Sequence, residues 1–242
     1  VDVHNFDTVT DAIATVQPDV VINAIGIIKQ TIAAQDPLAS LKVNSLFPHR
    51  LGVLCQASGA RLIHISTDCV FSGRKGDYAE KDIPDPQDLY GHSKLMGELN
   101  GEGQLTLRTS IIGRELETSY GLVEWFLSND GSRVQGYTDA IFTGFPTLIL
   151  ARIIGDIIEQ HRSLSGLYHI SSDLITKYEL LCLLQGAYQV HIEIEPSADI
   201  RINRSLDSSS FHNVTGFTSL DWREMVHEMA SDPTPYEDWR MG

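Results

Sequence analysis

The sequence predicts an α/β fold of the doubly wound type, in which helices cover both faces of a parallel sheet. Short apolar segments rich in branched residues alternate with longer segments of helical spacing along most of the chain. Two of the apolar segments, residues 19–24 and 61–66, run into polar or glycine-containing turns, as buried parallel strands do. Ligands of open parallel sheets bind beyond the carboxyl ends of the strands, so functional residues are expected there.

Composition limits the classes of partner. The chain has 242 residues, 42% of them apolar and 21% charged, as expected for a soluble globular protein of one large or two small domains. Its net charge of −14 argues against nucleic acid or an anionic membrane as a main partner. The nine His residues show no pairing at ligand spacing, so we expect no metal site. A second copy of the chain, in a homodimer, is one candidate partner.

The cysteines indicate the compartment. Cys55, Cys69 and Cys182 are odd in number, scattered and without a CxxC pair, which favours reduced thiols in a cytoplasm. The sequence shows no signal peptide and no apolar segment of membrane-spanning length. We therefore expect a cytoplasmic protein.

Periodicity places the elements in chain order. Phe6 to Val16 has helical spacing, and a buried strand follows at residues 19–24. Asp36-Pro37 begins a helical stretch through Ser58, with a kink expected at Pro48. Trp125 is expected in the core, and Thr176 is a candidate N-cap. Further strands are predicted at residues 61–66, 105–112, 166–170 and 191–195, and further helices at residues 90–94, 120–127, 148–158, 178–184 and 220–229.

Two motifs around the strand at 61–66 carry the chemistry. The strand runs into Ser66-Thr67-Asp68, and Tyr90 and Lys94 follow, four residues apart, so that a helix places them on one face. A free phenol has a pKa of roughly 10, and an ammonium one turn away is expected to lower it. The Thr67 hydroxyl can then hold a substrate oxygen beside the phenol. The pattern predicts proton transfer coupled to hydride transfer, whereas Tyr90 and Lys94 alone would suit any amphipathic helix start.

These residues resemble the extended short-chain dehydrogenase/reductase superfamily, and within it the dTDP-4-dehydrorhamnose reductases and related nucleotide-sugar enzymes. The resemblance rests on Ser-Thr-Asp followed by Val-Phe-x-Gly, an acidic Pro-rich loop and Tyr-Gly-x-Ser-Lys, and it extends from Val1 to about Trp222. It implies a Rossmann-type doubly wound sheet with a small C-terminal α/β substrate lobe. Residues 1–115 and about 136–170 would form the dinucleotide-binding domain, and about 116–135 and 171–242 the substrate-binding lobe.

The resemblance also implies roles for individual residues. Tyr90 would donate the proton, Lys94 would assist it and hold the nicotinamide ribose, and Thr67 would anchor the keto oxygen. NADPH or NADH would be the cofactor and a nucleotide sugar the substrate. The residues expected at the cofactor are Asp2, Val3, Ala24, Gly26, Ile27, Ile28, Asn44 and Ser66, with Tyr90 and Lys94. Those expected at the substrate are Thr67, Asp68, Ile111, Thr143, Gly144, Thr147 and Arg204.

Local alternatives remain for several of these residues. Asp68 either orients the substrate or caps a turn, and the glycine after the strand at 19–24 suits a plain turn as well as a cofactor. Thr143, Gly144 and Thr147 suit turn roles equally well. Arg204 has the fork of donors that suits a diphosphate, but a surface ion pair would use it too.

Two departures from the family pattern narrow the reaction. Cys69 stands where the related dehydratases carry Glu, which disfavours water elimination. Ile111 stands where the rhamnose-precursor reductases tend to carry Trp, so the particular sugar is left open.

No glycine-rich phosphate loop between a strand and a helix is found in this sequence. In the family that loop belongs to a first strand–helix–strand unit, expected before Val1 with roughly 35 to 60 residues. In the strand order 3-2-1-4-5-6, residues 19–24 would be strand 3 and residues 61–66 strand 4, separated by two missing central strands. We therefore expect the 242-residue chain to bind a dinucleotide poorly.

The predicted function is NAD(P)H-dependent reduction of a 4-keto nucleotide-deoxysugar in the synthesis of cell-surface polysaccharide precursors. One rival is an NAD-dependent nucleotide-sugar 4-epimerase. A second is a non-catalytic binding subunit, since the chain also resembles the regulatory β subunit of methionine adenosyltransferase.

Overall fold

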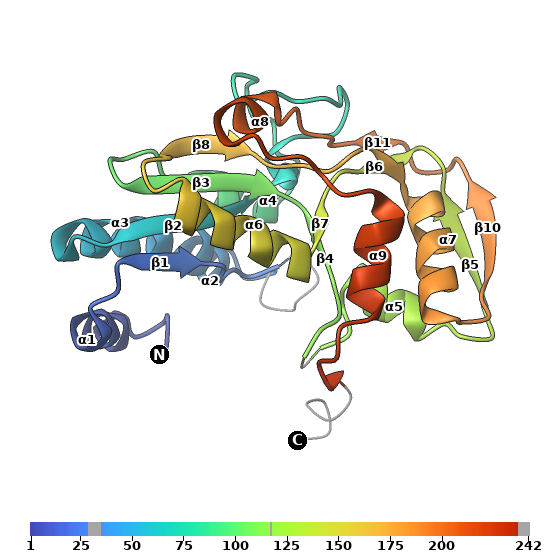
Figure 1. The fold of residues 1–242 in the computed structure, drawn as a ribbon, viewed down its shortest axis with the longest axis horizontal. Coiled ribbons are helices and arrows are strands. Elements are labelled where there is room, and N and C mark those ends of the chain that lie inside the picture. Colours follow the sequence, from blue (N-terminus) through green and yellow to red (C-terminus); the bar gives the residue numbers. More distant parts are fainter. Residues whose placement is uncertain (29–34, 117, 237–242) are drawn as a thin grey trace.

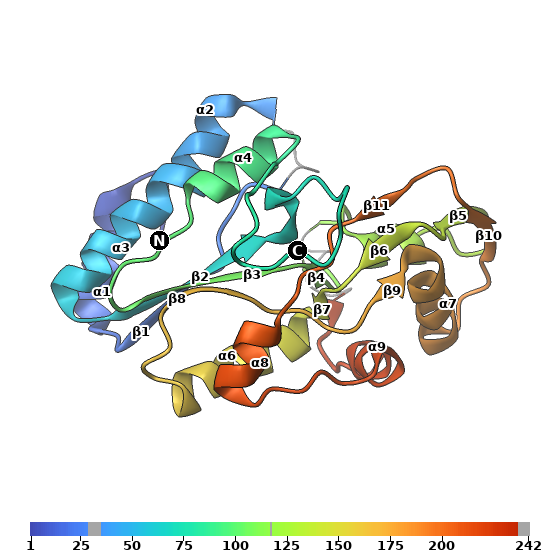
Figure 2. The same cartoon turned by 90° about the horizontal axis from the view of Figure 1, so that it is seen from above.

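A four-stranded parallel sheet forms the centre of the structure, a computed structural model that describes residues 1–28, 35–116 and 118–236 (Figure 1). Its strand order is β1-β2-β3-β8, with bounds Val20–Asn23, Arg61–Thr67, Gln104–Thr109 and Gly166–His169. Seen from above, α1 to α4 lie on one side of the sheet and α6 and α8 on the other (Figure 2). The predicted α/β fold is confirmed.

The predicted numbering of the strands is wrong. β1 pairs directly with β2, from Val20 opposite Arg61 to Asn23 opposite His64, so no strand lies between them. The helical stretch that joins them is an ordinary crossover between neighbouring parallel strands, which is the commonest arrangement for consecutive strands. The predicted gap in the middle of the sheet is therefore absent from this part of the fold.

The crossover between β1 and β2 is one long helical stretch with a widened turn. α2 (Pro37–Ser40) leads into a π-helical segment, η2 (Leu41–Leu46), and then into α3 (Phe47–Ser58). Pro48 has no N–H to offer the carbonyl of Asn44 one turn earlier, which favours a wider turn here. That carbonyl meets Gly97, where an added Cβ would lie 1.9 Å from Asn44 O. Only glycine lets the end of α4 (Leu89–Met96) approach this turn.

The remaining elements build the smaller, C-terminal part. β5 (Arg133–Tyr137) pairs with β10 (Glu193–Ser197), and β6 (Ala140–Phe142) lies between β11 (Ile202–Asn203) and β9 (Ile175–Thr176). Residues 136–142, expected with the dinucleotide-binding part, thus pair with C-terminal strands. The other elements are α1 (Phe6–Val16), η3 (Asp68–Val70), β4 (Ile111–Ile112), β7 (Phe145–Pro146) and the helices α5 to α9 at Leu122–Leu127, Thr147–Gln160, Lys177–Tyr188, Ser209–Thr215 and Trp222–Ala230.

Two large apolar clusters hold these parts together. One joins the sheet to α5, α6, α7 and α9 through residues such as Leu107, Phe126, Phe145 and Met225. The second lies under α1 and α3. Trp125 is 41% exposed, so its expected core position is wrong. None of the helices in the described residues combines the length and the apolar character needed to cross a bilayer.

Candidate active site

Thr67 and Tyr90 meet at the carboxyl end of β2. Thr67 is 6% exposed, and its hydroxyl accepts a hydrogen bond from the Cys69 amide at 3.1 Å. The side chain of Tyr90, the second residue of α4, interacts with that of Thr67. Helix α4 is positioned for this contact because Asp88 accepts from the Gly91 amide at 2.8 Å. Gly91 also lies against the Cys69 carbonyl, only 2.3 Å from where a Cβ would be.

Lys94 lies one turn further along α4, under the same strand. Its ammonium donates to the carbonyl of Ile65 at 2.6 Å, and the residue is 5% exposed. Burial lowers the pKa of Lys94 to about 8, while the nearby Glu98 carboxylate opposes this change. An added Cβ on Gly26 would lie 3.9 Å from this ammonium. The loop after β1 therefore passes close to Lys94.

The expected acidification of Tyr90 is wrong for this structure. Burial raises the pKa of Tyr90, mainly because the phenolate loses its hydration, and the hydrogen bond with Thr67 opposes that rise. At neutral pH the phenol therefore keeps its proton. That is the form a proton donor requires.

Asn44 connects the loop after β1 to α4. Its side-chain carbonyl accepts from the Ile27 amide at 2.8 Å, and its amide donates to the Ile27 carbonyl at 3.0 Å and to the Ser93 hydroxyl at 3.1 Å. Asn44 is 1% exposed, so these bonds fix the loop. The structure brings Asn44, Gly26, Ile27 and Lys94 together, as expected for one site.

Asn23 and His64 form a second polar pair that the sequence did not indicate. The Asn23 amide lies 3.0 Å from Nδ1 of His64, which therefore accepts, leaving the proton on Nε2. His64 is fully buried, and its Nε2 has no hydrogen-bond partner among the described residues. Burial and the charge of Lys94 lower the pKa of His64 to about 3. His64 is neutral in the folded protein.

A buried ionic network lies behind the site. Glu98 accepts from the Ser66 hydroxyl at 2.6 Å and binds Arg108 through both oxygens, at 2.8 and 2.7 Å. Arg108 also donates to Nε2 of His169 at 3.2 Å, and Nδ1 of His169 donates to the Tyr78 carbonyl at 2.9 Å. Ser66, expected at the cofactor, thus has its hydroxyl engaged by Glu98.

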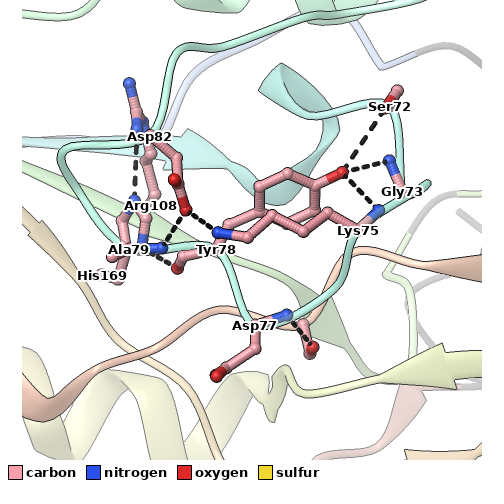
Figure 3. A network of polar contacts seen from close by, with 10 residues as sticks. Ser72, Gly73, Lys75, Asp77, Tyr78, Ala79, Asp82, Arg108 and His169 are labelled. Atoms are coloured by element: carbon pink, nitrogen blue, oxygen red, sulfur yellow. Dashed lines mark hydrogen bonds and ion pairs between the residues drawn. The ribbon is translucent and has the colours of Figure 1, made fainter.

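This network reaches the polar loop at residues 72–88. Figure 3 shows the Tyr78 hydroxyl accepting from the backbone amides of Gly73 and Lys75, at 3.2 and 3.1 Å. The Tyr78 ring stacks on Phe71, with centroids 4.2 Å apart. The loop at residues 72–88 is therefore anchored on a buried tyrosine.

The expected substrate residues divide into two groups. Asp68 faces two cations, Arg204 and Lys177, and burial raises the pKa of its carboxyl against their effect. Arg204 donates through Nε to the Phe71 carbonyl at 2.8 Å, which holds the side chain beside the same strand end. Two cations of the C-terminal lobe, Arg204 and Lys177, thus lie near Asp68.

The remaining expected substrate residues either contact the backbone or are exposed to solvent. Gly144 packs against Ser110 O, 2.1 Å from where a Cβ would be, and the Thr147 hydroxyl donates to the Ile112 carbonyl at 3.2 Å. Thr143 is buried, and its carbonyl accepts from the Ser172 amide at 2.9 Å. Ile111 is 47% exposed. The substrate roles of these four residues stay predictions.

Asp2 and Val3 lie with α1. Asp2 accepts from the His4 amide at 2.9 Å and donates through its own amide to Thr8, while Val3 packs on the cluster under α1 and α3. Neither of these contacts involves the residues gathered around Lys94. Their expected place at the adenine stays a prediction.

The residues after β1 fit the nicotinamide half of a dinucleotide. Ala24, Gly26 and Ile28 are exposed, and Gly26 lies close to Lys94, where an added Cβ would narrow the space. One proton of the Lys94 ammonium goes to Ile65 O, so two further donors can face a ribose hydroxyl. As for metals, no three His, Cys, Asp or Glu side chains gather at ligand distance within residues 1–28, 35–116 and 118–236.

Comparison with known proteins gives relatives of two kinds. Methionine adenosyltransferase 2 subunit beta of Danio rerio is 32% identical, over 76% of this chain and 60% of its own length. The chain thus spans about three fifths of that relative. A probable low-salt glycan biosynthesis reductase of Haloferax volcanii is 28% identical, over 99% of this chain and 85% of the relative.

A solved structure and a family model agree on the fold. The dTDP-4-dehydrorhamnose reductase of Bacillus anthracis in complex with NADP superposes with a TM-score of 0.83 at 23% identity, covering 97% of this chain and 87% of the reductase. The family model for the RmlD substrate binding domain matches residues 1–234. The chain belongs to the RmlD substrate-binding domain family.

Proposed function

We propose that the protein reduces the 4-keto group of a nucleotide-linked deoxysugar with NADPH or NADH, in the synthesis of cell-surface polysaccharide precursors. The observation that carries the proposal is the interaction between the side chains of Tyr90 and Thr67, with the Lys94 ammonium buried under the same strand end. Membership of the family and the similarity to a glycan biosynthesis reductase support it.

Each side chain has one task in this reaction. Thr67 holds the keto oxygen beside the Tyr90 phenol, and Tyr90 gives its proton to that oxygen. The raised pKa of Tyr90 keeps the proton in place until the step occurs. Lys94 offers a positive charge under the end of β2 and donors to the ribose. When bound, the reduced nicotinamide supplies the hydride to the keto carbon, so the products are a secondary alcohol and the oxidised cofactor.

Lys94 sets the pH range of this activity. Because its pKa is about 8, it is mostly charged at neutral pH and loses its charge as the pH rises through that value. Turnover is therefore expected to fall above pH 8.

The test is turnover of a nucleotide sugar by the protein. A dTDP-linked 4-keto-6-deoxyhexose is supplied with NADPH, and oxidation of NADPH is compared with formation of the alcohol. Tyr90→Phe removes one oxygen and is expected to lower turnover by about 100- to 10,000-fold. Equal rates for Tyr90→Phe and the unmodified protein would contradict the assignment.

Cofactor affinity is measured first, and titration of NADPH fluorescence gives it directly.

A 4-epimerase is the first rival, and one observation counts against it. An epimerase begins by removing a proton from the sugar hydroxyl, which needs an ionised phenol, whereas the raised pKa of Tyr90 favours the protonated form. Release of oxidised cofactor in proportion to product separates the two, since an epimerase consumes none.

A non-catalytic subunit is the second rival, favoured by the similarity to methionine adenosyltransferase 2 subunit beta. This reading predicts no turnover of any nucleotide sugar, together with co-purification of a methionine adenosyltransferase. Turnover that depends on Tyr90 would exclude it.

A further inference from the structure

Lys177 lies at the site although nothing in its sequence context pointed to it. It is the first residue of α7, in the C-terminal lobe. The start of this helix is fixed by a capping box, in which Thr176 accepts from the Glu179 amide at 3.1 Å and Glu179 accepts from the Thr176 amide at 3.0 Å. The backbone that carries Lys177 is therefore held in one place.

The ammonium of Lys177 faces the end of β2. It lies 4.1 Å from the centroid of the Phe142 ring and interacts electrostatically with Asp68 and Cys69. The same two residues act on Tyr90. Lys177 and Tyr90 thus reach one short segment from two different parts of the fold.

The hydrogen-bonding capacity of this ammonium is unused within the described part of the chain. An ammonium has three donors, yet Lys177 makes only the ring contact and its electrostatic contacts there. Burial is strong enough to lower the pKa of Lys177 to about 8. A partly dehydrated cation with free donors at a strand end is suited to bind an oxygen of a ligand.

The neighbouring Asp68 determines which kind of ligand oxygen Lys177 can bind. A phosphate would meet the carboxyl group of Asp68 as well as the ammonium, and like charges oppose each other at such range. A hydroxyl group suits the pair, because it donates to the carboxyl and accepts from the ammonium. Thr67, the expected anchor of the keto oxygen, is the residue before Asp68. The hydroxyl is therefore the one next to the keto carbon.

We propose that Lys177, together with Asp68, recognises the sugar hydroxyl adjacent to the reacting carbon. Through this contact the C-terminal lobe contributes to the specificity for the sugar. The inference rests on the proposed function and adds to it a residue and a substrate feature.

The test compares a sugar with its deoxy analogue. UDP-glucose and dTDP-glucose are titrated calorimetrically into the unmodified protein, and the tighter ligand is used with its 3-deoxy analogue and its free nucleoside diphosphate. The protein is expected to prefer the hydroxylated sugar by about 10- to 100-fold, since a buried polar group left unpaired costs roughly 1–3 kcal/mol.

Lys177→Met is expected to remove that preference and to leave the affinity for the free nucleoside diphosphate unchanged. Lys177→Gln serves as a second variant if the first does not fold, as judged by its unfolding transition. The matched control is Lys81→Met, an exposed lysine of the loop at residues 72–88, which should change neither affinity.

Three results would overturn the inference in distinguishable ways. Equal losses for the sugar and the free nucleoside diphosphate would make Lys177 a diphosphate contact. An undiminished preference for the hydroxylated sugar in both variants would remove Lys177 from recognition. An unmodified protein that binds neither nucleotide sugar would refute the proposed function itself, and the role of Lys177 with it.

Discussion

Lys94 and Lys177 are two lysines that burial affects to a similar degree, one on the central-sheet side of the site and one in the C-terminal lobe. The pKa of each is lowered to about 8. Lys94 is fixed by the Ile65 carbonyl at 2.6 Å, whereas Lys177 is held over the Phe142 ring, which takes none of its protons. The comparison teaches that similar electrostatics can serve different tasks. A cation that is hydrogen-bonded to the backbone suits a catalytic step that needs a charge at a fixed position. A cation with unused N–H donors suits the recognition of a ligand.

The most direct test of the difference between Lys94 and Lys177 is to remove each charge in turn. Lys94→Met is expected to lower kcat by about 100- to 10,000-fold, because the fixed charge under the end of β2 and its donors to the ribose are lost. Lys177→Met is expected to raise KM by about 10- to 100-fold with a smaller change in kcat. Steady-state kinetics on a 4-keto nucleotide sugar measures both. Equal effects on kcat from the two variants would contradict separate roles for the two lysines.

Glu98 is the carboxylate that acts on Lys94, as Asp68 acts on Lys177. Its bidentate pair with Arg108 is almost fully buried, with side chains 9% and 4% exposed. Glu98→Gln leaves the Arg108 charge buried without its partner and is expected to lower the free energy of unfolding by about 3 kcal/mol. Urea unfolding measures this. The matched control is Glu228→Gln, whose ion pair with Arg152 is exposed and is expected to contribute less than about 1 kcal/mol.

His64 makes the Lys94 side of the site sensitive to acid. Its pKa is about 3 in the folded protein against an ordinary 6.5, so the unfolded chain takes up the proton first as the pH falls. Stability is therefore present above pH 6.5 and lost between pH 6.5 and 3, by about 2 kcal/mol between pH 8 and 5. His64→Leu should reduce that loss, whereas His92→Ala, at an exposed position, should retain it. The pH dependence of urea unfolding decides between these outcomes.

The smallest expected effect is that of replacing Phe142, whose ring contacts the Lys177 ammonium. Phe142→Leu keeps an apolar side chain but removes the cation–π contact, which is worth about 1 kcal/mol at a partly buried site. Affinity for the nucleotide sugar is expected to fall about fivefold, measured by calorimetry. Phe6→Leu, under the Arg50 guanidinium at 3.8 Å, is the matched control and should leave the affinity unchanged. A fivefold loss in both variants would assign the effect to general packing.

Several features followed from the sequence because they depend on local spacing. The helix at Phe6–Val16, the capping by Thr176 and the strands on either side of the site follow from periodicity and from the chemistry of single residues. Tyr90 and Lys94 lie on one helix face because four residues make about one turn. Their contacts with the end of β2 agree with the expected arrangement.

Other features depend on packing between distant segments and had no local signal. The raised pKa of Tyr90 comes from burial under several elements, and the neighbours of His64 include Asn23, 41 residues away. The direct pairing of β1 with β2 was also missed, since strand order is set by how crossovers pack and not by the strands' own residues.

The sequence by itself determined the α/β class, the positions of most helices and strands, and the tyrosine–lysine pair beside a strand-end threonine. Only the tertiary structure decided which charges surround that pair, because electrostatic effects depend on distance and hydration rather than on position in the chain. Lys177 illustrates this: it lies 109 residues after Asp68 in the sequence, and the folding of the C-terminal lobe brings it to the same strand end.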